Sequence, residues 1–147
     1  MVAIVQRVTR AAVLVAGEMI SSIDKGMVVL VAAEIGDAEK EVEWMSNRLV
    51  GFRIYEDEQG KMNLDAGEIG AAFLVVSNFT VAGEAQKGRR PSFDRAAPYE
   101  QGKVLFDALV DQMMASGAIV KTGRYGAEMS VEIHNDGPIT IIVETPR

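Results

Sequence analysis

The run Met27–Ala33 is continuously apolar and rich in β-branched residues, and it constrains the fold more than any other segment. Such a run, which follows the turn-forming Asp24-Lys25-Gly26, is typical of a strand buried on both faces of a sheet. Ala71–Ser77 has the same character. A sheet that is covered on both faces needs further layers, so other elements must pack against it.

Shorter runs of β-branched residues surround these two segments. They predict strands at Val2–Val8, Ala11–Val15, Met19–Ile23, Phe52–Tyr55, Ile119–Thr122, Met129–Asn135 and Ile139–Val143. Many neighbouring runs are separated by turns of hairpin length. The sequence therefore favours a mostly antiparallel sheet.

In two segments the spacing of apolar residues is that of a helix rather than that of a strand. Apolar residues recur at helical spacing after Asp37, which is expected to be the N-cap, as far as about Val50. A second helix is predicted from about Pro98 to Ser116. No linker or internal repeat divides the chain, so we expect one α+β domain over residues 1–147 with two main helices.

The composition excludes several classes of protein. The chain has 147 residues, of which 48% are hydrophobic, and it contains no cysteine. Disulfides, cysteine nucleophiles and thiolate metal sites are thereby excluded. No stretch approaches the roughly 18 uncharged apolar residues of a membrane span. We therefore expect a soluble, cytoplasmic protein with no membrane partner.

Familiar catalytic side-chain sets are missing from the sequence. The single histidine, His134, lies in a predicted strand, where alternation places it opposite its apolar neighbours on the surface. It could serve as a general base, but no G-x-S-x-G motif accompanies it. No zinc-binding spacing, P-loop or dinucleotide-binding glycine pattern occurs, so neither a metal nor a cofactor is expected.

Two segments have unusual chemistry for their position. Ser77-Asn78-Phe79-Thr80 ends a buried strand, where successive backbone N–H groups can face a developing oxyanion. The alternative is a strand end whose polar side chains satisfy the turn. Asn135–Thr140 contains Gly137-Pro138, which interrupts a strand ladder. The alternative there is a tight hairpin turn.

A series of motifs along the whole chain resembles the D-aminoacyl-tRNA deacylase family. The motifs are Gln6–Ala11, Phe52–Asp57 with Gly60–Asn63, Ser77–Thr80, Lys87–Phe93, Thr122–Met129 and Asn135–Thr140. The resemblance implies an enzyme that hydrolyses the ester of D-aminoacyl-tRNA in chiral proofreading. It also implies that the 3′ end of tRNA is the partner, and that a homodimer carries its active site at the subunit interface.

The resemblance assigns the selectivity to main-chain groups. In the family the Gly-Pro peptide is cis and reaches into the pocket of the partner subunit, a role that would fall here to Gly137 and Pro138. Their carbonyl oxygens would face the substrate Cα and leave no room for an L side chain. Arg7 matches the residue that anchors this segment through hydrogen bonds to backbone carbonyls.

The resemblance also places the reacting ester. Ser77–Thr80 would line the pocket for the terminal adenosine and the ester, with the N–H groups of Phe79 and Thr80 as oxyanion donors. A positioned water, assisted by the substrate's ribose hydroxyl, would attack, because a Thr80 nucleophile lacks an adjacent base in the sequence. Met129 would pack near the adenosine or, alternatively, serve as an ordinary core residue.

The chain departs from the family pattern at Asn78, where glutamine is usual. Asparagine is one methylene shorter, which puts its amide in doubt as a catalytic contributor but leaves the backbone donors intact. The net charge of −6 argues against a broad basic RNA-binding face, although Lys87-Gly88-Arg89-Arg90 is a local basic cluster. These features keep two rival functions open: a non-catalytic nucleic-acid-binding or protein-binding dimer, and a hydrolase of other misacylated tRNAs with looser chirality.

Overall fold

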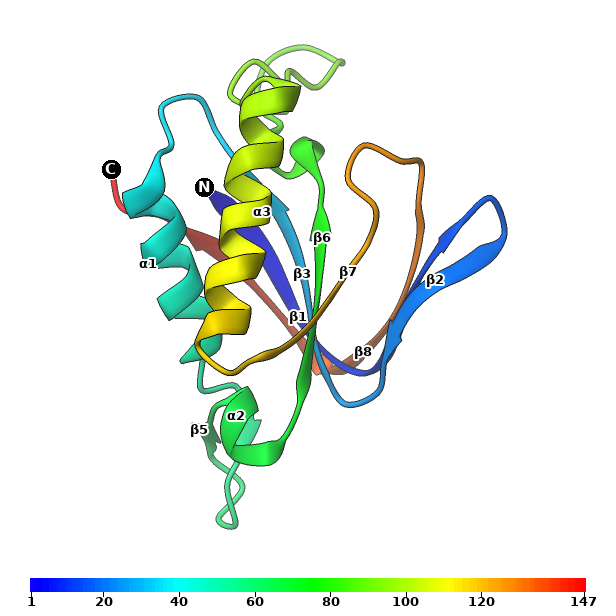
Figure 1. Cartoon of the computed structure of the whole chain (residues 1–147), viewed down its shortest axis with the longest axis vertical. Helices are drawn as coiled ribbons and strands as arrows, with labels where there is room; N and C mark the ends of the chain where they lie inside the picture. The colour runs from blue at the N-terminus through cyan, green and yellow to red at the C-terminus, as the bar shows by residue number, and fades with distance from the viewer.

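The computed structural model describes every residue from Met1 to Arg147, and Figure 1 shows their arrangement. The elements in chain order are β1 (Val2–Val15), β2 (Glu18–Ile23), β3 (Gly26–Ala32), α1 (Glu39–Val50), β4 (Tyr55–Glu56), β5 (Met62–Leu64), α2 (Ala66–Ile69), β6 (Ala72–Ser77), the 3₁₀ turn η1 (Phe79–Ala82), α3 (Tyr99–Ala115), β7 (Ile119–Thr122) and β8 (Ser130–Glu144). The α+β class and the two long helices are confirmed, and α2 adds one short helix. None of the helices is long and apolar enough to cross a membrane.

Strand β1 organises the main sheet because both of its edges are paired. Its first half pairs with β3 and its second half with β2, while β8 follows the opposite edge. All three pairings are antiparallel. The two strands predicted at Val2–Val8 and Ala11–Val15 are therefore parts of one continuous strand.

The main sheet is mixed, so the prediction of a mostly antiparallel sheet is wrong. The strand order is β2-β1-β3-β6-β7, with β8 beside β1, and the pairs β3–β6 and β6–β7 are parallel. The segments that connect these parallel pairs contain α1 and α3. Such crossovers return the chain to the end of the sheet from which it started, which makes the joined strands parallel. Within the main sheet, hairpin-length turns join only β1, β2 and β3.

The curled sheet packs against a separate apolar cluster on each face. On one face α1 and α3 lie side by side (Figure 1) and bury the larger cluster, which includes Phe73 and Leu109. On the other face Leu74 belongs to a second cluster, against which Val131 and Ile133 of β8 pack. The apolar runs of β3 and β6 are therefore buried on both faces, as predicted.

Helix α1 begins at Glu39, and its N-cap is Ala38 rather than the predicted Asp37. The Asp37 carboxylate instead accepts a hydrogen bond of 2.6 Å from the backbone N–H of Glu34. It also lies 2.8 Å from the amino nitrogen of Met1. Because these buried contacts occupy the carboxylate, it is not free to cap the helix.

Candidate functional site

A cavity of about 490 Å³ lies at the carboxyl end of β6, beside the parallel strands β3 and β7. The carboxyl ends of parallel strands are a common place for a ligand site in α/β sheets. The lining is mostly apolar and contains no acidic, basic or histidine side chain. It consists of Leu30, Val76, Ser77, Asn78, Phe79, Tyr99, Tyr125, Gly126, Ala127, Met129 and Val131.

The corner after β6 leaves backbone N–H groups without a partner inside the turn that follows. Strand β6 ends at Ser77, and the N–H of Asn78 donates to the carbonyl of Val31 at 2.9 Å. The 3₁₀ turn η1 follows, and its first internal bond runs from the N–H of Val81 to the carbonyl of Asn78 at 3.1 Å. The first N–H groups of such a turn have no partner within it, so those of Phe79 and Thr80 remain available.

The hydroxyl of Thr80 is engaged by a neighbouring amide. Thr80 Oγ1 donates to Asn78 Oδ1 at 2.5 Å. No carboxylate or imidazole accepts this proton, and no group of three or more His, Cys, Asp or Glu side chains converges anywhere in the chain. The arrangement therefore lacks the base that a threonine nucleophile requires. The hydrogen bond from Thr80 also gives the Asn78 side chain a structural role, because it holds the two side chains of this turn together.

Two tyrosines form a wall of the cavity that the sequence reasoning did not identify. The rings of Tyr99 and Tyr125 meet edge to face with centroids 5.1 Å apart, and the Tyr125 hydroxyl donates to the carbonyl of Tyr99 at 3.0 Å. Burial raises the pKa of Tyr125, and the neighbouring Tyr99 raises it further. At Gly126 a Cβ atom would come within 2.4 Å of the Tyr99 hydroxyl oxygen. Gly126 also has φ +76°, a conformation that favours glycine, and it lets the loop after β7 lie against this ring without displacing it.

Aromatic and sulfur-containing side chains complete the rim. Phe79 is 59% exposed and packs edge to face against Phe93, with ring centroids 5.4 Å apart. Met129 lines the cavity and also packs against the second apolar cluster. At Gly123 a Cβ atom would come within 2.6 Å of the Met129 sulfur, which shows how closely this loop lies against the methionine. Met129 therefore contacts the cavity and the apolar core at once, and its packing against an adenosine stays a prediction.

Gly137 and Pro138 lie in a bulge of β8, not in a hairpin turn. Gln6 of β1 pairs with Thr140, but Val8 pairs with Asn135, so the residues between them project out of the ladder. Both flanking parts of β8 pair with the same strand and run in the same direction. The Gly137–Pro138 peptide is cis, and Gly137 has φ +118°. Both residues are exposed, and neither lines the cavity of its own chain.

Arg7 lies directly beneath this bulge, but its contacts differ from those expected. Arg7 is 8% exposed, and Nη1 donates to the carbonyl of Ile54 at 2.9 Å. Nε lies 3.1 Å from Asp136 Oδ2, an ion-pair distance, without the alignment of a hydrogen bond. Within one chain Arg7 therefore contacts the bulge through the Asp136 carboxylate rather than through the carbonyls of Gly137 and Pro138.

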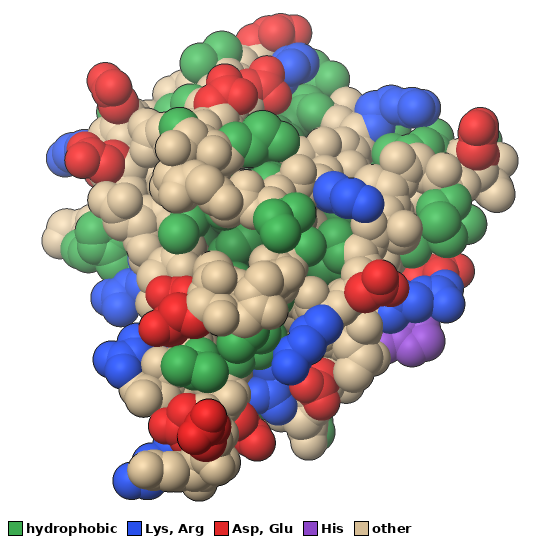
Figure 2. All heavy atoms as spheres, turned by 60° about the horizontal axis from the view of Figure 1, so that its bottom comes forward, with side chains coloured by type: hydrophobic (Ala, Val, Ile, Leu, Met, Phe, Trp, Pro, Cys, Tyr) green, Lys and Arg blue, Asp and Glu red, His purple; other side chains and the backbone are tan.

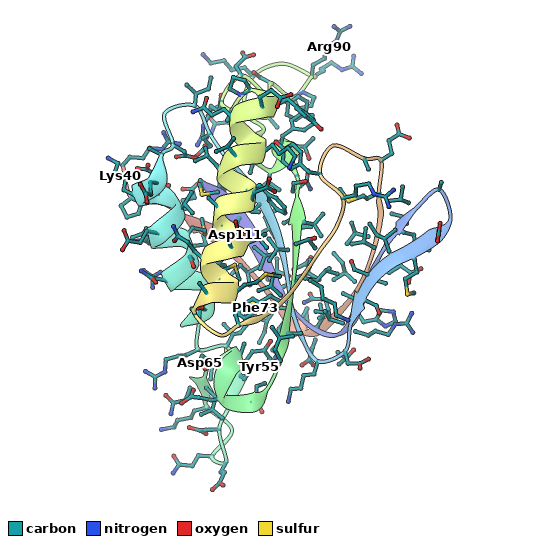
Figure 3. All side chains as sticks on the ribbon, in the orientation of Figure 1. Lys40, Tyr55, Asp65, Phe73, Arg90 and Asp111 are labelled. Carbon is teal, nitrogen blue, oxygen red and sulfur yellow. The ribbon has the colours of Figure 1, made fainter.

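The basic loop stands at the end of the molecule beyond α3. Lys87, Arg89 and Arg90 are exposed, and Figure 3 shows Arg90 projecting away from the ribbon. The base of the loop is fixed by Arg95, which forms an ion pair with the buried Glu34. Figure 2 shows another face, on which acidic and basic side chains intermingle. The basic residues of this loop therefore form a local cluster, whereas no broad basic patch is present on the face in Figure 2.

Comparison with known proteins identifies relatives over the full length of the chain. Residues 4–144 match the family described as D-Tyr-tRNA(Tyr) deacylase. A D-aminoacyl-tRNA deacylase of Geobacter metallireducens is 48% identical over 147 residues, which are 100% of this chain and 97% of that protein. One of Thermoanaerobacter pseudethanolicus is 47% identical over 145 residues, covering 99% and 97% of the two chains.

Solved structures share the fold. A structure described as "c-Myc DNA Unwinding Element Binding Protein" superposes with a TM-score of 0.95 at 39% identity over 100% of both chains. A probable eukaryotic D-amino acid tRNA deacylase superposes with a TM-score of 0.81 at 16% identity over 97% of both chains. At 16% identity, the second superposition supports the fold alone.

Proposed function

Because the chain belongs to the D-Tyr-tRNA(Tyr) deacylase family, we propose that it hydrolyses D-aminoacyl-tRNA to free D-amino acid and tRNA while sparing the L-aminoacyl ester. The observation that carries this proposal is the corner after β6, where Phe79 lines an uncharged cavity and the first N–H groups of the 3₁₀ turn, those of Phe79 and Thr80, have no partner within the turn. A site of this kind can stabilise an oxyanion without a catalytic side chain. We place this proofreading in the cytoplasm, where tRNA is charged.

The cavity is suited to the terminal adenosine of tRNA. Its aromatic wall of Phe79, Tyr99 and Tyr125 offers rings on which a base can stack, and stacking contributes about 1–3 kcal/mol per base. Met129 adds a polarisable apolar surface. The hydroxyl of Ser77 and the amide of Asn78 supply polar groups beside it. The basic loop Lys87–Arg90 is our candidate contact for the phosphates of the acceptor end.

The reaction needs only a positioned water and the backbone donors. The water oxygen attacks the ester carbonyl carbon, and the N–H groups of Phe79 and Thr80 bind the developing oxyanion. The bond to the ribose oxygen then breaks, and that oxygen leaves with a proton that originates from the attacking water. The ribose hydroxyl of the substrate assists this transfer. The products are the amino acid and a free tRNA 3′ end.

We propose that the chiral filter comes from a second copy of the chain. In a homodimer, Gly137 and Pro138 of one subunit would enter the cavity of the other and oppose the substrate Cα with their carbonyl oxygens. Their exposure on a bulge, away from the cavity of their own chain, supports this arrangement. Strand β8 also lies at an edge of the sheet, paired only with β1. An L side chain would then collide with the bulge, whereas a D side chain would point to solvent.

Thr80→Ala is expected to retain substantial activity. The substitution removes a hydroxyl that donates to Asn78 but keeps the backbone N–H in place. Loss of one hydrogen bond between exposed side chains changes the rate by about tenfold or less. Single-turnover hydrolysis of D-tyrosyl-tRNA measures the effect. Complete loss of activity in a folded variant would instead assign Thr80 as the nucleophile.

A nucleic-acid-binding protein without catalysis is the second candidate. It is favoured by the description of one similar structure as a DNA-unwinding-element binding protein, and by asparagine at position 78 where the family usually has glutamine. The two functions differ in whether the ester bond is broken. A binding protein would retain aminoacyl-tRNA and leave the ester intact.

Incubation with D-tyrosyl-tRNA and with L-tyrosyl-tRNA tests the proposed function. We expect rapid loss of the D ester and loss of the L ester at the uncatalysed rate. Comparable loss of both esters would favour the hydrolase with looser chirality, and loss of neither would favour the binding protein. A reaction without protein gives the uncatalysed rate for each ester.

A further inference from the structure

Phe79 holds its ring at the rim of the cavity with little support from the apolar core. The residue is 59% exposed and belongs to none of the three apolar clusters. Its ring packs edge to face against Phe93, with centroids 5.4 Å apart and an interplanar angle of 78°. In such a pair at least one face of each ring stays uncovered by the other. Phe93 therefore supports the Phe79 ring and leaves it a face on which a base can stack.

Phe93 also packs against the other end of η1. At Gly83, which follows this turn, a Cβ atom would come within 2.9 Å of Phe93 Cε1 and 2.8 Å of the Thr80 carbonyl oxygen. Gly83 has φ −67°, a value that any residue adopts, so space rather than conformation favours glycine here. The Phe93 ring therefore lies against the first residue of η1 and against the residue that ends it.

The backbone on both sides of Phe93 is fixed by hydrogen bonds. Glu84 and Ser92 exchange two backbone hydrogen bonds of 2.8 Å, which close the loop that carries Lys87–Arg90. The carbonyl of Phe93 accepts from the N–H of Ala96 at 3.1 Å. The Phe93 ring therefore stands at the stem of the basic loop. Figure 1 shows this loop at the same end of the molecule as the carboxyl end of β6.

We propose that Phe93 is a positioning residue for the terminal base of tRNA: from its fixed place at the stem of the basic loop, it holds the Phe79 ring in the orientation that stacks on the base. This inference rests on the proposed function, in which the adenosine enters the cavity and the loop contacts the phosphates. Phe93 does not line the cavity and acts through Phe79. Without Phe93, binding of the base would have to order the Phe79 side chain, and that cost weakens binding.

Phe93→Ala tests the proposal through the split between KM and kcat. We expect KM for D-tyrosyl-tRNA to rise about two- to tenfold, the range for one aromatic pair or one ordered side chain. The value of kcat should not change, because the backbone donors stay in place. Phe93→Tyr keeps the ring and should keep the wild-type KM.

Trp44→Ala is the matched control for the loss of a partly exposed aromatic ring. Trp44 lies on α1, outside the cavity, and Arg48 Cζ is 5.0 Å from the centroid of its ring. Its loss should destabilise the fold without changing KM. A purely structural role of Phe93 would give the same result, so an unchanged KM in folded Phe93→Ala would overturn the inference.

The double variant shows whether Phe93 acts through Phe79. In the Phe79→Ala background, Phe93→Ala should raise KM no further, because the ring that it holds is already absent. Independent, additive increases in KM would overturn the inference.

Failure of the proposed function gives a different result, in which the wild-type protein leaves the D ester intact. The inference is then tested by binding of uncharged tRNA. Phe93→Ala should bind it about two- to tenfold more weakly than the wild-type protein does. Equal affinity, or no binding by either protein, would overturn the role of Phe93.

Discussion

Gly137→Ala is expected to reduce D-tyrosyl-tRNA hydrolysis by about a hundredfold, the typical cost of misplacing a positioning group by about 1 Å. Gly137 has φ +118°, a conformation that L side chains rarely adopt. An added Cβ atom would come within 2.8 Å of Ile139 Cγ1 and 3.0 Å of the Ile139 nitrogen. The bulge must therefore shift. Single-turnover rates on D-tyrosyl-tRNA measure the loss.

Gly60→Ala is the matched control for this variant. Gly60 has φ +76°, and an added Cβ atom would meet nothing within 4 Å. Both substitutions place alanine at a positive φ, but only Gly137 lies in the proposed filter. Near-wild-type hydrolysis by Gly137→Ala, or an equal loss in both variants, would contradict the role assigned to the bulge.

Phe79→Pro is expected to lower kcat by about 10²–10³-fold, the range found when one oxyanion donor is removed. Proline lacks the N–H that is proposed to bind the oxyanion. It suits the first position of a helical turn, and Asn78 before it has φ −149° and ψ 89°, an extended conformation that proline tolerates. The backbone is therefore expected to keep its path. Single-turnover hydrolysis of D-tyrosyl-tRNA gives the rate of the chemical step.

Phe79→Ala separates the donor from the ring. It removes the same aromatic side chain but keeps the N–H, so we expect only the loss of stacking, which is about 1–3 kcal/mol and appears mainly in KM. The difference in kcat between the two variants therefore measures the contribution of the Phe79 N–H to catalysis. Equal kcat values in the two variants would argue against an oxyanion site at this corner.

The sequence predicts the elements of the fold better than their connections. Met27–Ala33 and Ala71–Ser77 are correctly identified as strands buried on both faces, and α3 nearly matches the helix predicted over Pro98–Ser116. Apolar periodicity determines these elements locally. Strand direction depends instead on where the long helices pack, so the parallel pairs were not predicted. The β4–β5 hairpin and α2 are too short to show a period.

The candidate site is only partly visible in the sequence. Ser77–Thr80 is recognisable because polar residues follow a buried strand directly. Tyr99 and Tyr125 were missed, since they meet only after α3 and β7 have folded back beside β6. Gly126, next to a tyrosine, is a weak signal, because it has φ +76° and lies against the Tyr99 ring without displacing it.

The proposed catalytic site is made from two subunits, with the N–H donors on one and the Gly137–Pro138 bulge on the other. Mixing two inactive variants tests this most directly. Phe79→Pro retains an intact bulge, and Gly137→Ala retains intact donors. In a mixed two-fold dimer, one of the two sites would combine unaltered donors with an unaltered bulge.

We predict that unfolding and refolding the two variants together in equal amounts restores D-tyrosyl-tRNA hydrolysis to about a quarter of the wild-type activity, because random pairing makes half of the dimers mixed. Each variant refolded alone should keep about a hundredth of the wild-type activity or less. Native mass spectrometry confirms that mixed dimers are present. If those dimers form and the mixture is no more active than the variants alone, the site does not lie between two subunits, and the central claim is contradicted.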